Sequence, residues 1–208
     1  MKVILVNGSP NAEGCTFTAL NAVGAELNAA GIETQLFQLG KAPIEGCRAC
    51  RLCFKQDGCV IDDNVNEFVN LMQDADGVVF GSPVHFASAT GKMVAFLDRA
   101  CFSSMRRGIF RGKVGACVVS ARRAGTTAAL DQLNKYLTYG QMVVATSRYW
   151  NMVHGTNPDE VRQDLEGMQV MRVLGRNMAW ILRSLEAGRQ AGIEMPEPEK
   201  PEMTNFIR

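Results

Sequence analysis

Residues 2–30 constrain the fold more than any other stretch of this chain. A short apolar run stops at Asn7 and enters Gly8-Ser9-Pro10, as a buried strand does when it turns into a tight loop. Beyond Gly14 the sequence takes up helical spacing, with one face formed by Phe17, Leu20, Gly24 and Leu27. These residues predict a strand-loop-helix unit.

The loop of this unit has the composition of an anion site. The start of a helix offers unpaired N–H groups and a partial positive charge. Gly8, Ser9 and Gly14 are small enough for the backbone to close around a phosphate. A plain turn is the alternative, since Gly-Ser-Pro punctuates many loops. We favour a phosphate because ligands of open parallel sheets bind beyond the carboxyl ends of the strands, and this loop leaves the first strand.

Strand and helix patterns alternate five times along the chain. The predicted strands cover residues 2–6, 33–38, 78–80, 113–120 and 142–145. The helices that follow them begin near Gly14, Asn64, Val94, Thr127 and Asn157. This alternation predicts an α/β fold with a doubly wound, five-stranded parallel sheet. A phosphate loop after the first strand indicates the flavodoxin-like strand order 2-1-3-4-5.

The chain is long enough for one domain with one core, which we place at residues 1–190. Its last helix is expected to break near Gly167 or Gly175. Residues 39–63 show no clear helix or strand pattern and form a cysteine-rich insertion after the second strand. Residues 191–208 form an extended, proline-bearing tail. We expect the tail to lie across a second protomer of a homodimer or homotetramer through Met195, Met203, Phe206 and Ile207.

Charge and hydropathy exclude two classes of partner. A formal net charge of +1 gives no general electrostatic footprint for a nucleic acid. No apolar stretch approaches the roughly 20 residues that a membrane helix needs, and the run after Lys2 is too short for a signal peptide. We therefore expect a cytoplasmic protein with no nucleic-acid or membrane partner. In that compartment the seven cysteines are metal ligands or free thiols rather than disulfides.

Three loops leave the carboxyl ends of central strands and are expected to converge: residues 8–15, 81–88 and 120–126. The first suits a phosphate. The second offers Ser82, backbone N–H groups and the rings of His85 and Phe86, and the third brings Arg122 and Arg123. Together they suit a flat, polar-edged ring with a phosphate tail, such as flavin mononucleotide (FMN). The alternative places Phe86 in the core and the arginines in solvent.

These loops carry a resemblance to a known family. Gly8-Ser9-Pro10 with Thr16, and Gly81-Ser82-Pro83-Val84 leading to Phe96-Leu97-Asp98-Arg99, resemble the phosphate and ring loops of the flavodoxin-like NADPH-dependent FMN reductases. The resemblance implies FMN as cofactor and NAD(P)H as co-substrate. Matching positions would hold the phosphate through Ser9, Asn11, Gly14, Cys15 and Thr16, and the ring through Ser82, Pro83, Val84, His85, Phe86 and Ala87. The third loop would add Arg122, Arg123 and Gly125.

The phosphate loop departs from that family at two positions. Asn11 stands where the family often has arginine, and Cys15 stands where it often has asparagine or serine. The charge of a phosphate would therefore be met by N–H groups and the helix dipole alone.

The insertion contains four cysteines separated by two, two and five residues, namely Cys47, Cys50, Cys53 and Cys59. Two tight gaps let one loop wrap three corners of a cubane cluster, whereas structural zinc sites usually separate two such pairs by a longer knuckle. A [4Fe-4S] cluster, free thiols and zinc all stay open on spacing alone. The spacing resembles the motif of the iron-sulfur flavoproteins, a branch of the same fold, which implies that the four thiols ligate a [4Fe-4S] cluster.

Two further expectations concern the surroundings of these thiols. Arg48, Arg51 and Lys55 would offset thiolate charge, and without a metal they would lower the thiol pKa values. The insertion starts where the second strand ends, so we expect the cysteines near FMN, within the protomer or across an interface between protomers.

The sequence thus predicts an FMN-dependent oxidoreductase. It would pass electrons from NAD(P)H or a reduced protein donor to an acceptor such as a quinone, and no acid, base or nucleophile of the chain is required because the flavin performs the chemistry. One alternative is a non-enzymatic flavin and iron-sulfur electron carrier. Another is a cysteine-based redox or metal sensor.

Overall fold

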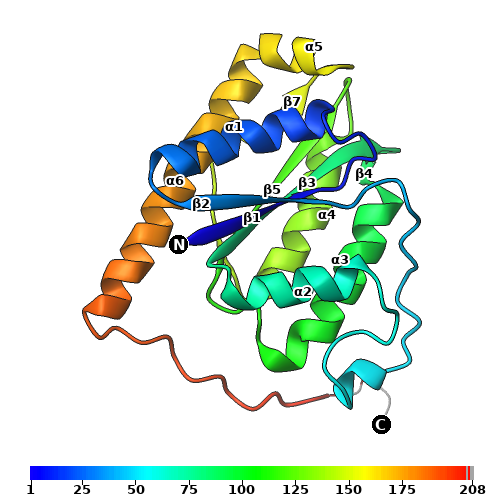
Figure 1. Cartoon of the computed structure of the whole chain (residues 1–208), viewed down its shortest axis with the longest axis vertical. Helices are drawn as coiled ribbons and strands as arrows, with labels where there is room; N and C mark the ends of the chain where they lie inside the picture. Colours follow the sequence, from blue (N-terminus) through cyan, green and yellow to red (C-terminus); the bar gives the residue numbers. More distant parts are fainter. Residues whose placement is uncertain (205, 207–208) are drawn as a thin grey trace.

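The computed structural model describes residues 1–204 and 206, and it shows a parallel sheet with helices on both faces (Figure 1). The five central strands have the order β2-β1-β3-β5-β6, which is the predicted order 2-1-3-4-5 with one short strand, β4, inserted in the numbering. Their bounds are β1 Lys2–Asn7, β2 Glu33–Gln38, β3 Gly77–His85, β5 Val114–Ala121 and β6 Val143–Val144. The predicted fold class is confirmed, but the sheet of the described residues has seven strands rather than five, because β4 and β7 (Met152–His154) join it.

The strand predicted at residues 142–145 is only two residues long in the structure, where it is β6. The chain leaves the sheet after β6 and returns to it as a second short strand, β7. β6 pairs with the start of β5, and β7 pairs in parallel with its end. Between the two strands, Asn151 replaces the missing ladder bonds, since its carbonyl accepts from Val119 N (3.0 Å) and its Nδ2 donates to the Cys117 carbonyl (3.1 Å). The β4 strand (Ser88–Ala89) forms an antiparallel hairpin with the end of β3.

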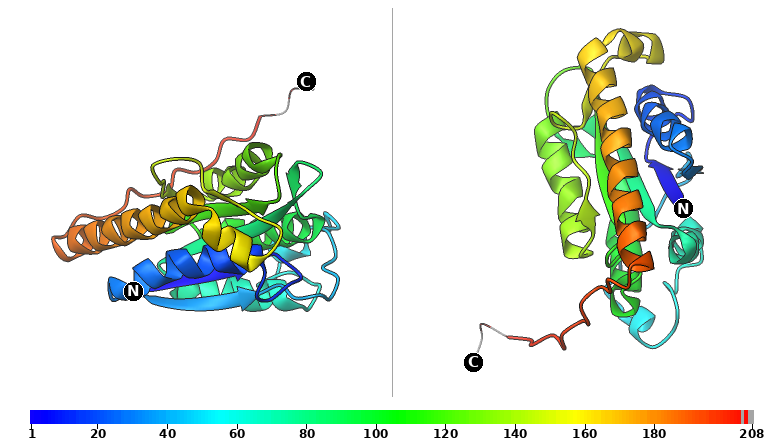
Figure 2. Two further views of the ribbon diagram at one scale, coloured as in Figure 1. Left: turned by 90° about the horizontal axis from the view of Figure 1, so that it is seen from above. Right: turned by 90° about the vertical axis from the view of Figure 1, so that its left-hand side faces the viewer.

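Each face of the sheet has its own apolar core. Three helices cover one face through residues such as Phe68, Phe96 and Leu133, namely α2 Asn64–Asp74, α3 Gly91–Ser104 and α4 Thr126–Tyr139. The other face is covered by α1 Cys15–Ala29, α5 Pro158–Gln163 and α6 Leu165–Gln190. Figure 2 shows α1 and α6 side by side over this second face.

The last helix breaks at Asp164, not at the glycines where we expected it. The Asp164 side chain caps α6 by accepting a hydrogen bond from Gly167 N (2.9 Å), and α6 then continues to Gln190. Gly175 instead allows close packing, because a Cβ on it would lie 2.7 Å from the carbonyl oxygen of Val23 in α1. A second cap also differs from expectation, since Asp63 rather than Asn64 caps α2 through Val65 N (3.0 Å).

The insertion and the tail carry little regular structure. Within residues 39–63 the structure has one short 3₁₀ helix, η1 (Leu52–Phe54). The described residues beyond Gln190 form no helix or strand, and they run as an extended segment past the loop before β5, where Arg111 donates to the Pro196 carbonyl. The division into a domain of residues 1–190 and a tail of residues 191–208 stays a prediction. No helix among the described residues is long and apolar enough to cross a bilayer.

Candidate functional site

The three loops predicted to converge do meet at the carboxyl edge of the sheet. Gly8 N donates to the Gly81 carbonyl (2.8 Å), which joins the first loop to the second. Thr16 and Ser120 share a hydrogen bond between their hydroxyls (2.8 Å), which joins the start of α1 to the end of β5. The second and third loops touch as well, because a Cβ on Gly125 would lie 2.7 Å from the Cα of Ala87.

Two of the helices that start at this edge, α1 and α4, begin in the same unusual way. Their N-caps are Gly14 and Gly125, no side chain of the described residues caps either helix, and neither has an acid in its first turn. In contrast, α2, α3, α5 and α6 each have a side-chain cap. The first N–H groups of α1 and α4 therefore remain available for an anion or a polar ligand edge, which fits the phosphate and the ring of FMN.

In the phosphate loop the side chains mainly shape the backbone. Ser9 is buried, and its hydroxyl accepts a hydrogen bond from Asn11 N (3.1 Å), while the Asn11 side chain is exposed. Thr16 is fully buried and faces Ser120 rather than the loop surface. Burial raises the pKa of the Cys15 thiol, whose Sγ lies 3.6 Å from the carbonyl oxygen of Gly155. A phosphate would therefore meet backbone N–H groups, as the departures from the family motif imply.

The second loop is a tight hairpin with a protruding corner. Ser82 is buried and holds the loop, accepting from Thr90 N (3.0 Å) and donating to the Pro83 carbonyl (2.9 Å). Phe86 and Ala87 occupy the corner between the paired residues of β3 and β4, with φ of 51° and 58°. This geometry normally selects glycine or asparagine and costs other residues roughly 1–2 kcal/mol each.

Phe86 is therefore not a core residue, and the alternative that placed it there is wrong. Its side chain has a relative exposure of 105%, because a hairpin corner projects away from the sheet. Such backbone strain is concentrated at ligand sites, where the surroundings hold it in place. Val84 packs at the base of the hairpin, and His85 is exposed beside Phe86.

Arg122 and Arg123 lie where the sequence placed them, directly after β5 and before α4. Both side chains are exposed, and neither makes a hydrogen bond or ion pair with another residue that the structure describes. Their positive charge at the edge is thus not neutralised by a neighbouring carboxylate.

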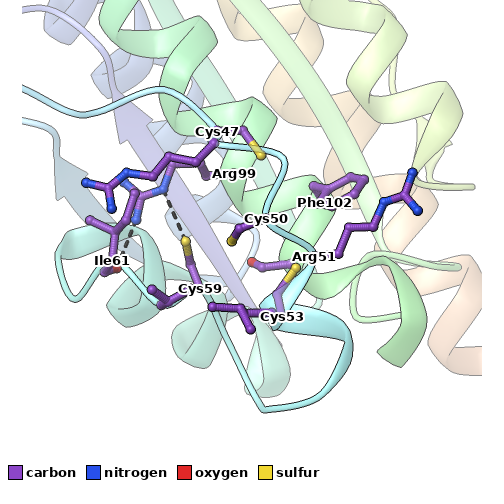
Figure 3. Close-up of a pocket in the computed structure, with 12 residues that line it drawn as sticks. Cys47, Cys50, Arg51, Cys53, Cys59, Ile61, Arg99 and Phe102 are labelled. Carbon is purple, nitrogen blue, oxygen red and sulfur yellow. Dashed lines mark hydrogen bonds between the residues drawn. The ribbon is translucent and has the colours of Figure 1, made fainter.

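All four cysteines of the insertion line one cavity of about 110 Å³ (Figure 3). Three arginines share its wall, Arg48, Arg51 and Arg99, and Lys55 does not. The remaining wall is mostly apolar and is formed by Leu52, Val60, Ile61 and Phe102. Cys101 and Cys117 lie outside this cavity, and burial raises the pKa of the Cys101 thiol to about 12, as expected for an unreactive core thiol.

The backbone of the insertion curls around the four thiols. Among the described residues no three His, Cys, Asp or Glu side chains converge in a way that holds one ion. Left-handed residues at Ala49 and Arg51 curl the backbone around the site, and Ala49 N donates to Cys47 Sγ (3.4 Å). Such curled segments with inward N–H groups are common at iron-sulfur sites.

The expected lowering of the thiol pKa values is wrong at Cys53. Burial raises the pKa of this thiol, and the neighbouring thiol of Cys59 adds to the rise. One of the three cations expected to lower it is also engaged elsewhere. Arg48 is paired with the Glu45 carboxylate, with Nη2 to Oε2 at 2.8 Å.

Arg99 is a site residue to which sequence reasoning gave no role. Its side chain is 0% exposed and forms a bidentate ion pair with Asp63, with N–O distances of 2.5 and 2.9 Å. Nε also points at Cys59 Sγ (3.4 Å). Burial alone would lower the pKa of Arg99, but the hydrogen bonds to Asp63 and Cys59 raise it. The sequence feature that could have indicated this role is the position of Arg99 among the apolar residues Phe96, Leu97 and Ala100 of one helix.

The cysteine cavity lies along α3, beyond the start of that helix at the ligand edge. The insertion leaves that edge at Leu39 but then follows α3 toward its far end. There Phe54 stacks on Phe102 with ring centroids 5.1 Å apart, and Arg106 donates to the Phe54 carbonyl (3.1 Å). From Gly91 to Phe102 the helix spans about 16 Å at 1.5 Å per residue.

Comparisons with known proteins identify the family of this chain. A family model described as NADPH-dependent FMN reductase matches residues 1–157. An iron-sulfur flavoprotein of Methanocaldococcus jannaschii is 31% identical over 198 residues, covering 89% of this chain and 100% of the relative. An iron-sulfur flavoprotein of Methanosarcina thermophila is 27% identical over 196 residues, covering 91% and 99%.

Solved structures agree on the fold. The crystal structure of RosB with bound 8-demethyl-8-formylriboflavin-5'-phosphate has a TM-score of 0.71 and 14% identity to this chain, and the alignment covers 100% of this chain and 92% of RosB. The chain belongs to the NADPH-dependent FMN reductase family, in the iron-sulfur flavoprotein branch.

Proposed function

We propose that this protein binds FMN at the three-loop edge and passes electrons from NAD(P)H or a reduced protein donor to an acceptor such as a quinone. The observation that carries this proposal is the meeting of the three loops around two helix starts without side-chain caps, α1 and α4. Bound FMN supplies the hydride and electron chemistry, so the chain needs no acid, base or nucleophile.

Each loop has a task in this proposal. N–H groups at the start of α1 bind the phosphate, and those at the start of α4 donate to the polar edge of the ring. The Phe86 hairpin presents an exposed aromatic side chain beside the ring, where a flat donor or acceptor can dock. Arg122 and Arg123 favour negative charge at this edge.

In the cysteine cavity, Cys47, Cys50, Cys53 and Cys59 would hold a [4Fe-4S] cluster, which supplies one-electron transfer when bound. The shared cavity and the curled backbone at Ala49 and Arg51 support a cluster over zinc or free thiols. The cavity's position along α3 supports electron exchange across an interface between protomers.

The decisive experiment combines an anaerobic absorption spectrum, iron and zinc analysis, and NADPH oxidation with a soluble quinone. We expect FMN and iron in the purified protein, and quinone-dependent turnover without any added protein. A carrier would oxidise NADPH only with a partner reductase, and a thiol sensor would bind no flavin. Absence of FMN binding on titration would overturn the proposal.

Neutralising the two arginines of the third loop is expected to weaken NADPH use. Arg122→Met with Arg123→Met removes two unpaired positive charges from the ligand edge. We expect KM for NADPH to rise about tenfold, since a charge-assisted hydrogen bond contributes roughly 1.5–3 kcal/mol. Arg107→Met is the matched control, because Arg107 is exposed but lies at the opposite edge. An unchanged KM and an unchanged flavin potential would mean that neither arginine contributes to ligand binding.

The tail is expected to hold protomers together. Met203 and Phe206 have relative exposures of 90% and 101%, and burial of such side chains contributes roughly 1.5–3 kcal/mol each. Ile207, which we also assigned to this contact, lies outside the described residues. Light scattering should show a dimer or tetramer for the full chain, and a smaller species for Met203→Ser with Phe206→Ser. A monomeric full-length protein would contradict this prediction.

A further inference from the structure

Arg99 uses every N–H of its buried guanidinium on the cysteine insertion. Of the five donors that an arginine has, Nε points to Cys59 Sγ (3.4 Å). Nη1 donates to Asp63 Oδ2 (2.5 Å) and the Glu45 carbonyl (3.4 Å), and Nη2 donates to Asp63 Oδ1 (2.9 Å) and the Ile61 carbonyl (2.9 Å). One side chain of α3 thus ties together the beginning and the end of the insertion.

Cys59 is held more firmly than the other three thiols. Its backbone is clamped by Asn66 of α2, because Cys59 N donates to Asn66 Oδ1 (2.7 Å) and Asn66 Nδ2 donates to the Cys59 carbonyl (2.8 Å). Its sulfur receives the Arg99 Nε–H, which Figure 3 shows as a dashed line. Cys47 and Cys50 lie on exposed backbone instead. Cys59 is therefore positioned by two helices before any metal binds.

We propose that Arg99 is a positioning residue that holds Cys59 as the anchor ligand and, through its Nε–H, raises the reduction potential of the cluster. This inference rests on the proposed cluster in the cysteine cavity. Reduction places further negative charge on the ligand sulfurs, and a hydrogen-bond donor at one of them stabilises the reduced state. Asp63 balances the guanidinium charge, so the effect is that of a directed donor rather than of net charge.

The test removes the ion pair as a whole. Arg99→Met with Asp63→Asn deletes the donor to Cys59 without changing the net charge or leaving one buried charge unpaired. Asparagine at position 63 can still cap α2 through Val65 N. Glu26→Gln with Arg176→Met is the matched control, since it removes a bidentate ion pair between α1 and α6, away from the cavity, and also keeps the net charge. Arg99→Lys is measured alongside. Lysine keeps the positive charge beside Asp63, so the protein should stay folded, but it lacks the planar guanidinium that reaches Asp63 and Cys59 together.

We expect the Arg99→Met, Asp63→Asn protein to keep its FMN. Its cluster should be tenfold harder to reduce by one electron, which lowers the reduction potential by about 59 mV. The control pair should show no shift, and Arg99→Lys a shift in the same direction as the first variant. Asp63→Asn alone should raise the potential, because it leaves the guanidinium charge unbalanced. In metal-free protein, hydrogen exchange of residues 45–61 should be faster in the Arg99→Met, Asp63→Asn protein than in the wild type, because the insertion loses the bonds that fix it to α3.

A potential that is equal in the wild type and both Arg99 variants overturns the electronic role. Equal hydrogen exchange of residues 45–61 in the metal-free wild type and the Arg99→Met, Asp63→Asn protein overturns the positioning role. Wild-type protein that binds FMN but takes up no iron under anaerobic reconstitution overturns this inference while leaving FMN-dependent electron transfer in place.

Discussion

Replacing Cys53 by serine is expected to remove the iron from this protein and leave its FMN bound. Cys53 lines the cavity together with Cys47, Cys50 and Cys59, and a serine hydroxyl is a poor substitute for a soft thiolate ligand. The phosphate and ring loops share no residue with that cavity, so flavin affinity should not change. Because metal binding contributes folding free energy, we also expect residues 39–63 to become easier to cleave by protease.

The measurements are iron per FMN, the broad visible absorption of the cluster, and the rate of electron transfer to the acceptor. All three should fall, the first two to background. Cys101→Ala is the matched control, because this thiol packs against the core outside the cavity and should affect none of them. If Cys53→Ser retains full activity and wild-type protein contains no iron, the protein is a plain flavin reductase with a structural cysteine loop.

A leucine at Thr16 is expected to weaken FMN binding 10- to 100-fold. Thr16 is fully buried between β3 and β5, where its hydroxyl meets Ser120 Oγ (2.8 Å). Its methyl group faces Gly81, on which a Cβ would come within 2.9 Å. Overpacking here costs about 1–3 kcal/mol, and the hydroxyl of Ser120 loses its partner at a similar cost. Each 1.4 kcal/mol that reaches the binding step is tenfold in affinity.

Titration with FMN and with riboflavin locates the effect. Because Thr16 supports the phosphate loop, the loss should be larger for FMN than for riboflavin, which lacks the phosphate. Thr16→Ser keeps the hydroxyl and should bind FMN with nearly wild-type affinity. Thermal melting without flavin shows whether the apoprotein remains folded. An unchanged FMN affinity in a folded Thr16→Leu protein would mean that the phosphate site has been misassigned.

Local patterns in the sequence were enough for much of the architecture. The strand-loop-helix unit of residues 2–30, the order of the five central strands and the meeting of three loops at one edge were all predicted. Hydrophobic periodicity and helix caps depend on residues that are close together in the chain, so they can be recognised in the sequence alone. Errors occurred where a distant partner overrode a local preference. Gly175 predicts a break in the last helix. In the fold it instead lets α6 pack closely on the Val23 carbonyl of α1.

The sequence by itself determined which four thiols belong together, because the spacing of Cys47, Cys50, Cys53 and Cys59 is a local property of one loop. Only the tertiary structure decided where that loop lies and what holds it. Its path along α3 depends on the bonds of Arg99 to Asp63 and Cys59, partners 36 and 40 positions away in the chain. Such contacts form when separate elements pack together, and no periodicity or motif along the chain records them.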